Sequence, residues 1–324
     1  MVTTARNGFD GRGKLALESA DGLSVDVEDY YHVEAFADRI TPAMWPQLPR
    51  RVADNTRRVL ELLERAGAKA TFFILGWVAE REPTVVREIL NAGHELGCHS
   101  YMHQRVWSLT PREFREDTRR ALAAIEDAAG EKVLGYRAPT FSIVPKSLWA
   151  VDVLAQEGFL YDSSVFPIRH DLYGMPDAPR FPFRWDCGNG RSICEIPPTT
   201  VRVLNWNLPA GGGGHLRILP MAYTRWALKR TRQHDGEPIT IYLTDTRSTQ
   251  TGTLLPSVTS HVASTNPNGS WDQVLSARVG TFEMIATGDT SGKKYDGILD
   301  LTTPTVAVTA TGVSTCQNVG LPVS

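Results

Sequence analysis

The chain has 324 residues, enough for one large α/β domain or for a barrel of about 200–250 residues with a small addition. Its 34 basic and 36 acidic side chains nearly balance, which argues against a nucleic-acid binder held by phosphate contacts. No stretch approaches the ~20 apolar residues of a membrane span, and the first residues hold no apolar run typical of a signal peptide, so we expect a cytoplasmic protein.

The first 243 residues predict a leader followed by an α/β unit. Residues 1–19 are polar and Gly-rich and indicate a loose leader. From residue 20 to 243, short apolar runs alternate with amphipathic segments, which is typical of a parallel sheet with βαβ crossovers. We expect strands at 23–26, 70–75, 94–98, 134–137 and 160–163, and helices at 52–66, 83–91, 110–129 and 146–157.

Two helix ends carry strong local signals. Gly67 follows the apolar repeat of the first helix and predicts its C-cap. Thr110, Pro111 and Glu113 together form an N-cap, a first-turn proline and a capping-box glutamate, which predict the start of the third helix.

The composition changes at residue 244. The last 81 residues hold 25 Ser or Thr but only four Lys or Arg, and helical periodicity ends. Residues 305–310 alternate like a half-buried strand, and 298–301 indicate another. We therefore expect residues 244–324 to be a short β-rich or partly disordered tail, foreign to the barrel.

Two histidines have the spacing of metal ligands. His99 and His103 are four residues apart, and on one helical turn this spacing places both imidazoles on one face. Neutral imidazoles suit Zn, Co, Ni or Fe. By itself the pair is a weak signal, because two unrelated surface histidines have the same spacing by chance.

Three carboxylates end the first expected strand. Asp26, Glu28 and Asp29 lie within four residues, an arrangement that is costly unless a cation or a substrate compensates the charge. Two histidines and one carboxylate would leave open metal positions for water and substrate. A solvated loop with a helix N-cap explains Asp29 but not Asp26, which follows a buried run. The spacing does not decide between Glu28 and Asp29 as the ligand.

Four motifs then occur in order between residues 26 and 166. They are Asp-Val-Glu-Asp-Tyr from Asp26, His-Ser-x-x-His from His99, Arg-Ala-Pro-Thr-Phe from Arg137, and Asp-Ser-Ser-Val-Phe from Asp162. On these motifs, residues 20–243 resemble the polysaccharide deacetylase (NodB-homology) family. The greatest similarity is to the subgroup encoded with bacterial exopolysaccharide-export genes.

The resemblance implies a distorted (β/α) barrel that removes N-acetyl groups from amino-sugar polysaccharides with the help of a divalent metal. Zn is the expected ion, with Co or Ni as alternatives. The implied catalytic residues are Asp26 as general base, Arg137 to orient it, and Asp162. The implied metal ligands are His99 and His103 with Glu28 or Asp29. We expect Tyr30, Tyr31 and Pro139 to contact the sugar, with Trp107 as a further stacking candidate; each aromatic could equally be an ordinary core or rim residue.

The chain departs from the family where the general acid is expected. The family has a Leu-x-His or Leu-His motif at the end of a late strand, whereas here the strand 238–243 is followed by Thr244 and Asp245. Either the barrel was truncated at 243 and joined to foreign sequence, or His215, after the glycine run 211–214, replaces the missing histidine. We favour truncation, because the resemblance ends and the composition changes at the same residue.

Three functions therefore remain open. The leading one is a carbohydrate N-deacetylase impaired by loss of its general acid. The second is a non-catalytic carbohydrate-binding or interaction protein on a degenerate deacetylase scaffold. The third is a related amide hydrolase that acts on small molecules.

Overall fold

The computed structural model describes residues 22–33, 36–188, 190–212, 215, 219–232 and 240–244, with only the backbone at 243 and 244. Beyond them it describes the backbone of short strand segments between residues 249 and 318. The expected leader at 1–19 and the expected strand at 305–310 lie outside the described residues. The division of the chain into three parts therefore stays a prediction.

The central element is a curled sheet with the strand order β10-β1-β2-β3-β4-β5-β7-β6-β16. Neighbours from β10 to β7 are parallel, and β6 runs antiparallel to β7. Strands β1 and β2 are buried along nearly their whole length, as expected for a parallel sheet covered by helices. The bounds are β1 (Gly22–Val27), β2 (Thr71–Ile74), β3 (Glu95–Cys98), β4 (Gly135–Tyr136), β5 (Tyr161–Asp162), β6 (Phe183–Asp186), β7 (Ser192–Glu195), β10 (Thr240–Thr244) and β16 (Gln317–Asn318).

The segment that follows β7 contacts β10 only at isolated points, including a parallel bridge between Gly212 and Tyr242. Thr199 N donates to Thr240 O at 2.8 Å, and Tyr242 N donates to Gly211 O at 2.8 Å. A side chain at Gly211 would place its Cβ only 2.4 Å from Thr240 O, so this close approach requires glycine. The predicted distorted (β/α) barrel is confirmed, and the distortion lies at this junction.

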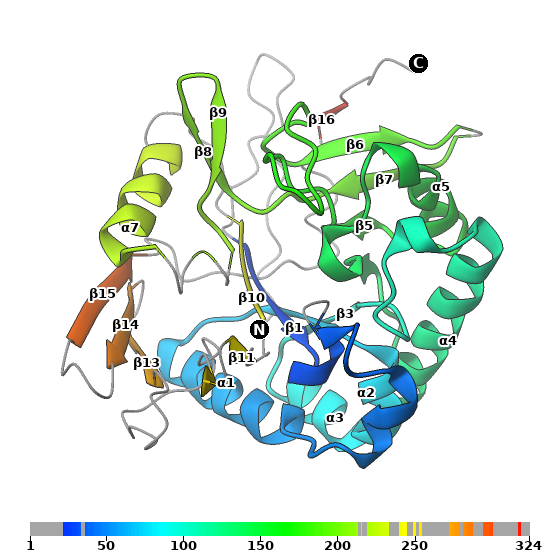
Figure 1. Cartoon of the computed structure of the whole chain (residues 1–324), viewed down its shortest axis with the longest axis horizontal. Helices are drawn as coiled ribbons and strands as arrows, with labels where there is room; N and C mark the ends of the chain where they lie inside the picture. The colour runs from blue at the N-terminus through cyan, green and yellow to red at the C-terminus, as the bar shows by residue number, and fades with distance from the viewer. Residues whose placement is uncertain are drawn as a thin grey trace, which may run out of the picture.

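Helices surround the outside of the sheet, and α7 lies beside the hairpin of β8 and β9 (Figure 1). This arrangement buries one apolar face of each helix against the sheet. The bounds are α1 (Val52–Ala66), α2 (Gly76–Arg81), α3 (Pro83–Asn91), α4 (Pro111–Ala129), α5 (Trp149–Gln156) and α7 (Met221–Arg230), with β8 (Thr200–Val203) and β9 (Trp206–Pro209).

Both predicted helix ends are confirmed. Gly67 caps α1 in the left-handed conformation, with φ of 61°. At the start of α4, Thr110 Oγ1 accepts a hydrogen bond from Glu113 N at 3.3 Å, and Glu113 Oε2 accepts one from Thr110 N at 2.8 Å. These signals are reliable because the groups that satisfy each other lie within one turn of chain.

Three helices differ from the predictions, and one of them, α7 (Met221–Arg230), was not expected from the sequence at all. Helix α5 begins at Trp149 rather than Lys146, because Pro145–Ser147 form a separate 3₁₀ turn. Helix α2 (Gly76–Arg81) was not predicted, since six residues are too few to reveal a helical period. Its Gly76 lies against α4, where an added Cβ would come within 2.7 Å of the Ala121 Cα.

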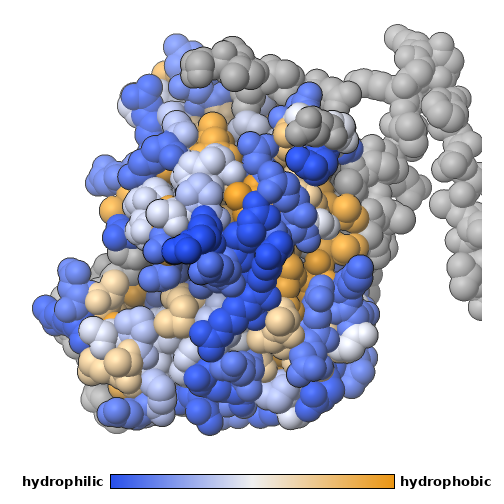
Figure 2. All heavy atoms as spheres, turned by 90° about the vertical axis from the view of Figure 1, so that its right-hand side faces the viewer, coloured by the Kyte–Doolittle hydropathy of each residue, from blue (hydrophilic) through white to orange (hydrophobic). Residues whose placement is uncertain are grey.

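The outer surface over α4 and α5 is mostly hydrophilic (Figure 2). Helix α4 buries Phe114 and Ile125 towards the sheet, while Arg119 on its outer side donates from Nε to Glu157 Oε2 at 2.7 Å. This face therefore follows the amphipathic pattern of a helix that covers a sheet.

Beyond the barrel, the described backbone includes an antiparallel sheet of β13 (Asp272–Arg278), β14 (Thr281–Thr287) and β15 (Lys294–Asp300). Two shorter strands, β11 (Thr249–Gln250) and β12 (Thr253–Leu254), also pair. The β-rich character expected after residue 244 agrees with these strands, and the strand predicted at 298–301 overlaps β15.

Within the described part of the chain, no helix is both long and apolar enough to cross a membrane.

Cys98 and Cys187 are free thiols, whereas Cys194 is disulfide-bonded.

Candidate functional site

Three buried side chains form a candidate metal centre where two parallel strands end. Glu28 follows β1, while His99 and His103 follow β3. One ligand atom from each residue lies within 4.8 Å of the other two, and Glu28 Oε2 is 2.7 Å from His103 Nε2. The carboxyl ends of barrel strands meet at one mouth, which explains how residues 28 and 99 come together.

The histidine segment is a loop, so the prediction of one helical turn is wrong. Ser100 and His103 both have positive φ, 65° and 52°, which a right-handed helix excludes. Ser100 Oγ accepts a hydrogen bond from His103 N at 3.0 Å. Asp117 on α4 also accepts from Tyr101 N at 2.8 Å and from Met102 N at 3.0 Å. Helix α4 thus holds the loop that brings the two imidazoles together.

A backbone bond selects the tautomer of His99. Its Nδ1 lies 2.8 Å from Arg137 O, and because a carbonyl only accepts, Nδ1 carries the proton and Nε2 keeps its lone pair. Burial lowers the pKa of His99, which favours the neutral imidazole that metals require. Burial raises the pKa of the Glu28 carboxyl, but His103 and the other nearby imidazoles outweigh this effect and lower it to about 2.

Asp29, the alternative ligand, is engaged elsewhere. Its Oδ1 accepts a hydrogen bond from Tyr30 N at 3.1 Å, and its Oδ2 accepts from Arg51 N at 2.7 Å and Val52 N at 3.1 Å. Asp29 therefore caps the 3₁₀ turn at residues 30–32 and holds the start of α1. Of the two carboxylates that the spacing left open, Glu28 is the one in the cluster.

The donor set of the cluster fits a divalent transition metal. It offers two imidazole nitrogens and one carboxylate oxygen, and all three residues are buried. This is the ligand combination of catalytic sites that leave coordination positions for water and substrate.

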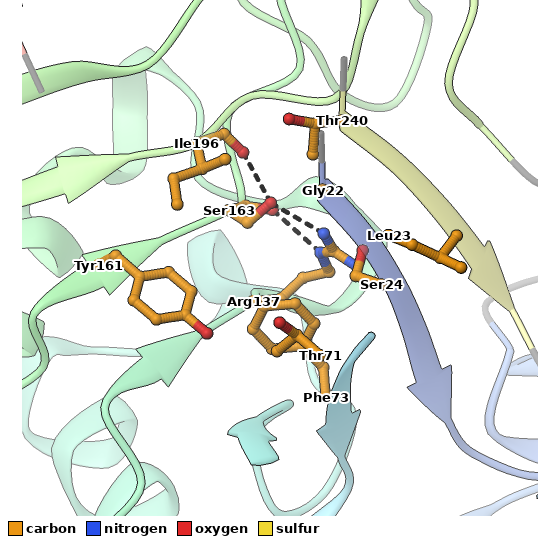
Figure 3. Close-up of a pocket in the computed structure, with 10 residues that line it drawn as sticks. All are labelled: Gly22, Leu23, Ser24, Thr71, Phe73, Arg137, Tyr161, Ser163, Ile196 and Thr240. Carbon is orange, nitrogen blue, oxygen red and sulfur yellow. Dashed lines mark hydrogen bonds between the residues drawn. The ribbon is translucent and has the colours of Figure 1, made fainter. Parts of the chain in front are cut away.

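The second part of the site is a buried ion pair. Arg137 Nη1 donates to Asp26 Oδ1 at 2.7 Å, and the Arg137 side chain is only 1% exposed. Its other nitrogens are held by Ser163: Nε donates to the Ser163 carbonyl at 3.1 Å and Nη2 donates to Ser163 Oγ at 2.8 Å. Ser163 Oγ in turn donates to Ile196 O at 2.7 Å, as Figure 3 shows. The guanidinium is thereby fixed in position and aimed at Asp26.

Asp162 lies next to this network but faces the other side of the sheet. Tyr161 and Ser163 line a cavity inside the barrel, and residues alternate along a strand, so Asp162 points away from that cavity. There it neighbours Glu195 in the register of β5 and β7, and both carboxyls are fully buried. Glu195 was not predicted from the sequence, although it ends a short strand after the apolar residues Ile193 and Cys194, which is the kind of signal that identified Asp26.

The expected sugar-contacting residues differ in their surroundings. Tyr31 is 1% exposed and lies in the core, with its ring 4.5 Å from the His32 ring and 6.0 Å from the Trp77 ring. Tyr30 is half-buried, and the Arg51 guanidinium lies 5.0 Å from its ring centre. Pro139 is buried and lies two residues after Arg137.

The expected stacking residue Trp107 contacts two cations. The Lys146 ammonium lies 4.5 Å from its ring centre and the Arg105 guanidinium 5.5 Å. The ring is thus held by neighbouring residues of this chain.

The strand that should deliver a general acid runs beside β1. In that parallel pair, Thr244 is in register with Asp26, so position 244 lies at the mouth of the barrel. His215, the alternative, packs edge-on against Phe166 with ring centres 6.3 Å apart. Burial lowers the pKa of His215.

Two family models match parts of the chain. Residues 44–157 match the family model described as polysaccharide deacetylase, and residues 163–244 match a domain of unknown function (DUF3473). The second match ends where the composition of the chain changes.

Two curated relatives are deacetylases by name. The peptidoglycan deacetylase-like protein FGM2 of Gibberella zeae is 31% identical over 118 residues, which are 36% of this chain and 34% of that protein. The peptidoglycan-N-acetylglucosamine deacetylase of Bacillus cereus is 33% identical over 98 residues, which are 30% of this chain and 36% of that protein. The chain therefore spans about a third of the length of each relative.

A solved structure supports the fold. The "putative polysaccharide deacetylase" from Mycobacterium smegmatis superposes with a TM-score of 0.51 at 21% identity, covering 76% of this chain and 82% of that one.

Proposed function

Because the chain belongs to the polysaccharide deacetylase (NodB-homology) family through its barrel, we propose that it hydrolyses N-acetyl groups of an amino-sugar polysaccharide. The observation that carries the proposal is that two sets of side chains lie together at the mouth of the barrel. These are the candidate ligands Glu28, His99 and His103 and the buried pair of Asp26 with Arg137. We propose a bacterial exopolysaccharide as the polymer and zinc as the ion.

Amide hydrolysis needs an activated water, a polarised carbonyl and a proton for the leaving amine. A divalent ion bound by Glu28, His99 and His103 would polarise the carbonyl and acidify water. Asp26 would take the proton of the attacking water. Its Oδ1 already accepts from Arg137, so we assign the proton transfer to Oδ2. The Arg137 guanidinium fixes the orientation of the Asp26 carboxylate through this contact of 2.7 Å.

Protonation of the leaving amine is the weak step in this chain. Position 244 lies beside Asp26 and carries threonine, which cannot act as an acid near neutral pH. General acid–base help is typically worth about 10²–10⁴-fold in rate. We therefore propose a metal-binding hydrolase with slow turnover.

The same observation favours one second candidate, a carbohydrate-binding protein without turnover. Loss of the acid at position 244 would leave the mouth of the barrel able to bind a glycan while the hydrolysis step is blocked. The two candidates differ in whether acetate is released.

The test measures acetate release from N-acetylglucosamine oligomers with added Zn or Co. We expect slow release by the natural chain, none by His99→Ala, and a faster rate for Thr244→His. Calorimetry with the same oligomers and with zinc runs in parallel. Zinc binding without acetate release, even from Thr244→His, would overturn the deacetylase proposal. Glycan binding without acetate release would favour the second candidate.

A further inference from the structure

A pair of buried acids lies directly behind the arginine network. Asp162 ends β5 and Glu195 ends β7, and the two are partners in the parallel register of these strands. Both are 0% exposed. Carboxyl groups are rarely buried so completely unless another group compensates them.

The hydrogen bonds of the pair are one proton short. Asp162 Oδ1 accepts from Ser164 Oγ at 2.5 Å, and Glu195 Oε1 accepts from Val165 N at 3.0 Å. The remaining oxygens, Asp162 Oδ2 and Glu195 Oε2, are buried and make no hydrogen bond of standard geometry with the described residues. The Trp185 side chain lies close enough to act on Glu195 as a donor, but it lowers the pKa of Glu195 less than burial and Asp162 raise it. Two ionised carboxylates can only accept, whereas one shared proton would satisfy both oxygens.

The pair is coupled to the arginine through the next residue on each strand. Side chains alternate along a strand, so Ser163 and Ile196 face the barrel interior where Asp162 and Glu195 face away. The Ser163 hydroxyl accepts from Arg137 and donates to Ile196 O (Figure 3). The distance between β5 and β7 at the acid pair therefore sets the distance between Ser163 and Ile196, and with it the position of the Ser163 hydroxyl that holds Arg137.

We propose that Asp162 and Glu195 share a single proton and act as a positioning pair that keeps Arg137 aligned with Asp26. This inference rests on the proposed function only for its effect on turnover. The pair touches neither the substrate nor the candidate ligands through any contact described above, so it acts through Ser163 and Arg137. Loss of the shared proton would leave two buried like charges on adjacent strands, which would push β5 and β7 apart.

The charges around the pair support one retained proton. Burial raises the pKa of Asp162 to about 6 and raises that of Glu195 well above its usual value. Arg137 is the nearby cation that acts on Asp162, and Tyr136 on β4 is the other titratable group beside it. Since the folded state holds this proton more tightly than the unfolded chain, its stability should fall as the pH rises through the raised pKa values of the pair.

The central experiment compares Glu195→Gln with Glu195→Ala in the full chain. A glutamine donates from its amide to Asp162 and still accepts from Val165 N, so it should replace the shared proton at every pH. We expect the melting temperature of the natural chain to fall as the pH rises from about 4 through the raised pKa values of the pair. The melting temperature of Glu195→Gln should fall less over the same range, because other buried carboxyls such as Glu95 still titrate there. Asp162→Asn, which supplies the donor from the other strand, should behave like Glu195→Gln. Glu116→Gln on the exposed face of α4 is the matched control and should keep the profile of the natural chain.

Two further readouts test positioning rather than stability alone. His99 donates to the Arg137 carbonyl, so Glu195→Ala should weaken zinc binding by about 10–100-fold below its melting temperature, as supporting residues of metal sites typically do. Where acetate release is measurable, kcat should fall by a similar factor, and Glu195→Gln should restore both. An unchanged melting profile in Glu195→Gln and Asp162→Asn would overturn the shared proton. Unaltered zinc affinity in Glu195→Ala would overturn the positioning role. The melting profile and the zinc affinity do not depend on turnover, so failure of the deacetylase proposal would be recognised separately.

Discussion

Replacement of Arg137 by methionine should be one of the most destabilising single changes in the barrel. The guanidinium is 1% exposed, donates to Asp26 and Ser163, and lies 4.2 Å from the centre of the Phe73 ring. Methionine keeps much of the apolar volume but removes every donor. Asp26 would then be a buried carboxylate without its cation.

The structure allows an estimate of the size of this effect. Removing one partner of a buried ion pair costs about 3–5 kcal/mol, because the other charge stays buried and unpaired. In a domain of this size each kcal/mol lowers the melting temperature by about 2–4 °C, which gives a fall of about 6–20 °C. The double variant Asp26→Asn/Arg137→Met should recover a large part of the loss, since the unpaired charge is gone.

Thermal unfolding followed by circular dichroism measures this effect directly. Arg112→Met is the matched control, because the Arg112 side chain is 84% exposed and its ion pair with Glu116 spans 3.9 Å. A fall for Arg137→Met no larger than that of the control would refute the argument from burial. A double variant less stable than Arg137→Met would show that Asp26 does not need a compensating cation.

Four other variants give distinct outcomes. Thr244→His should raise acetate release by about 10²–10⁴-fold, and an unchanged rate in a zinc-loaded sample would mean that position 244 does not serve the leaving amine. Asp29→Ala should lower the free energy of unfolding by about 1–3 kcal/mol, since buried backbone donors lose their acceptor, with little change in the zinc affinity measured by calorimetry. Glu28→Ala should instead weaken zinc binding, with a smaller effect on the free energy of unfolding. Equal zinc affinities in the two variants would contradict the assignment of Glu28. Burial raises the pKa of Glu95 to about 7, so its contribution to stability should fall by about 3 kcal/mol between pH 4.5 and 7. Glu95→Gln should flatten that part of the pH–stability curve, and a curve like that of the natural chain would place the titration elsewhere.

The sequence predicted most of the barrel because its signals are local. The ends of α1 and α4 follow from caps whose partners lie within one turn, such as Gly67 and the pair of Thr110 with Glu113. The apolar runs before residues 26 and 98 mark strands of a parallel sheet. Elements without such signals were missed, as the short helix at Gly76–Arg81 shows.

The sequence also determined the chemistry of the site: two imidazoles, a group of carboxylates and one arginine at the ends of predicted strands. Only the tertiary structure decided which of these residues meet. Glu28 joins His99 and His103, while its neighbour Asp29 turns away to cap α1. The pairing of Asp162 with Glu195 likewise depends on the register of β5 and β7. The physical reason is separation along the chain. Local spacing limits which way a side chain points, but residues 28 and 99, or 162 and 195, come together only when strands distant in sequence pair in the sheet.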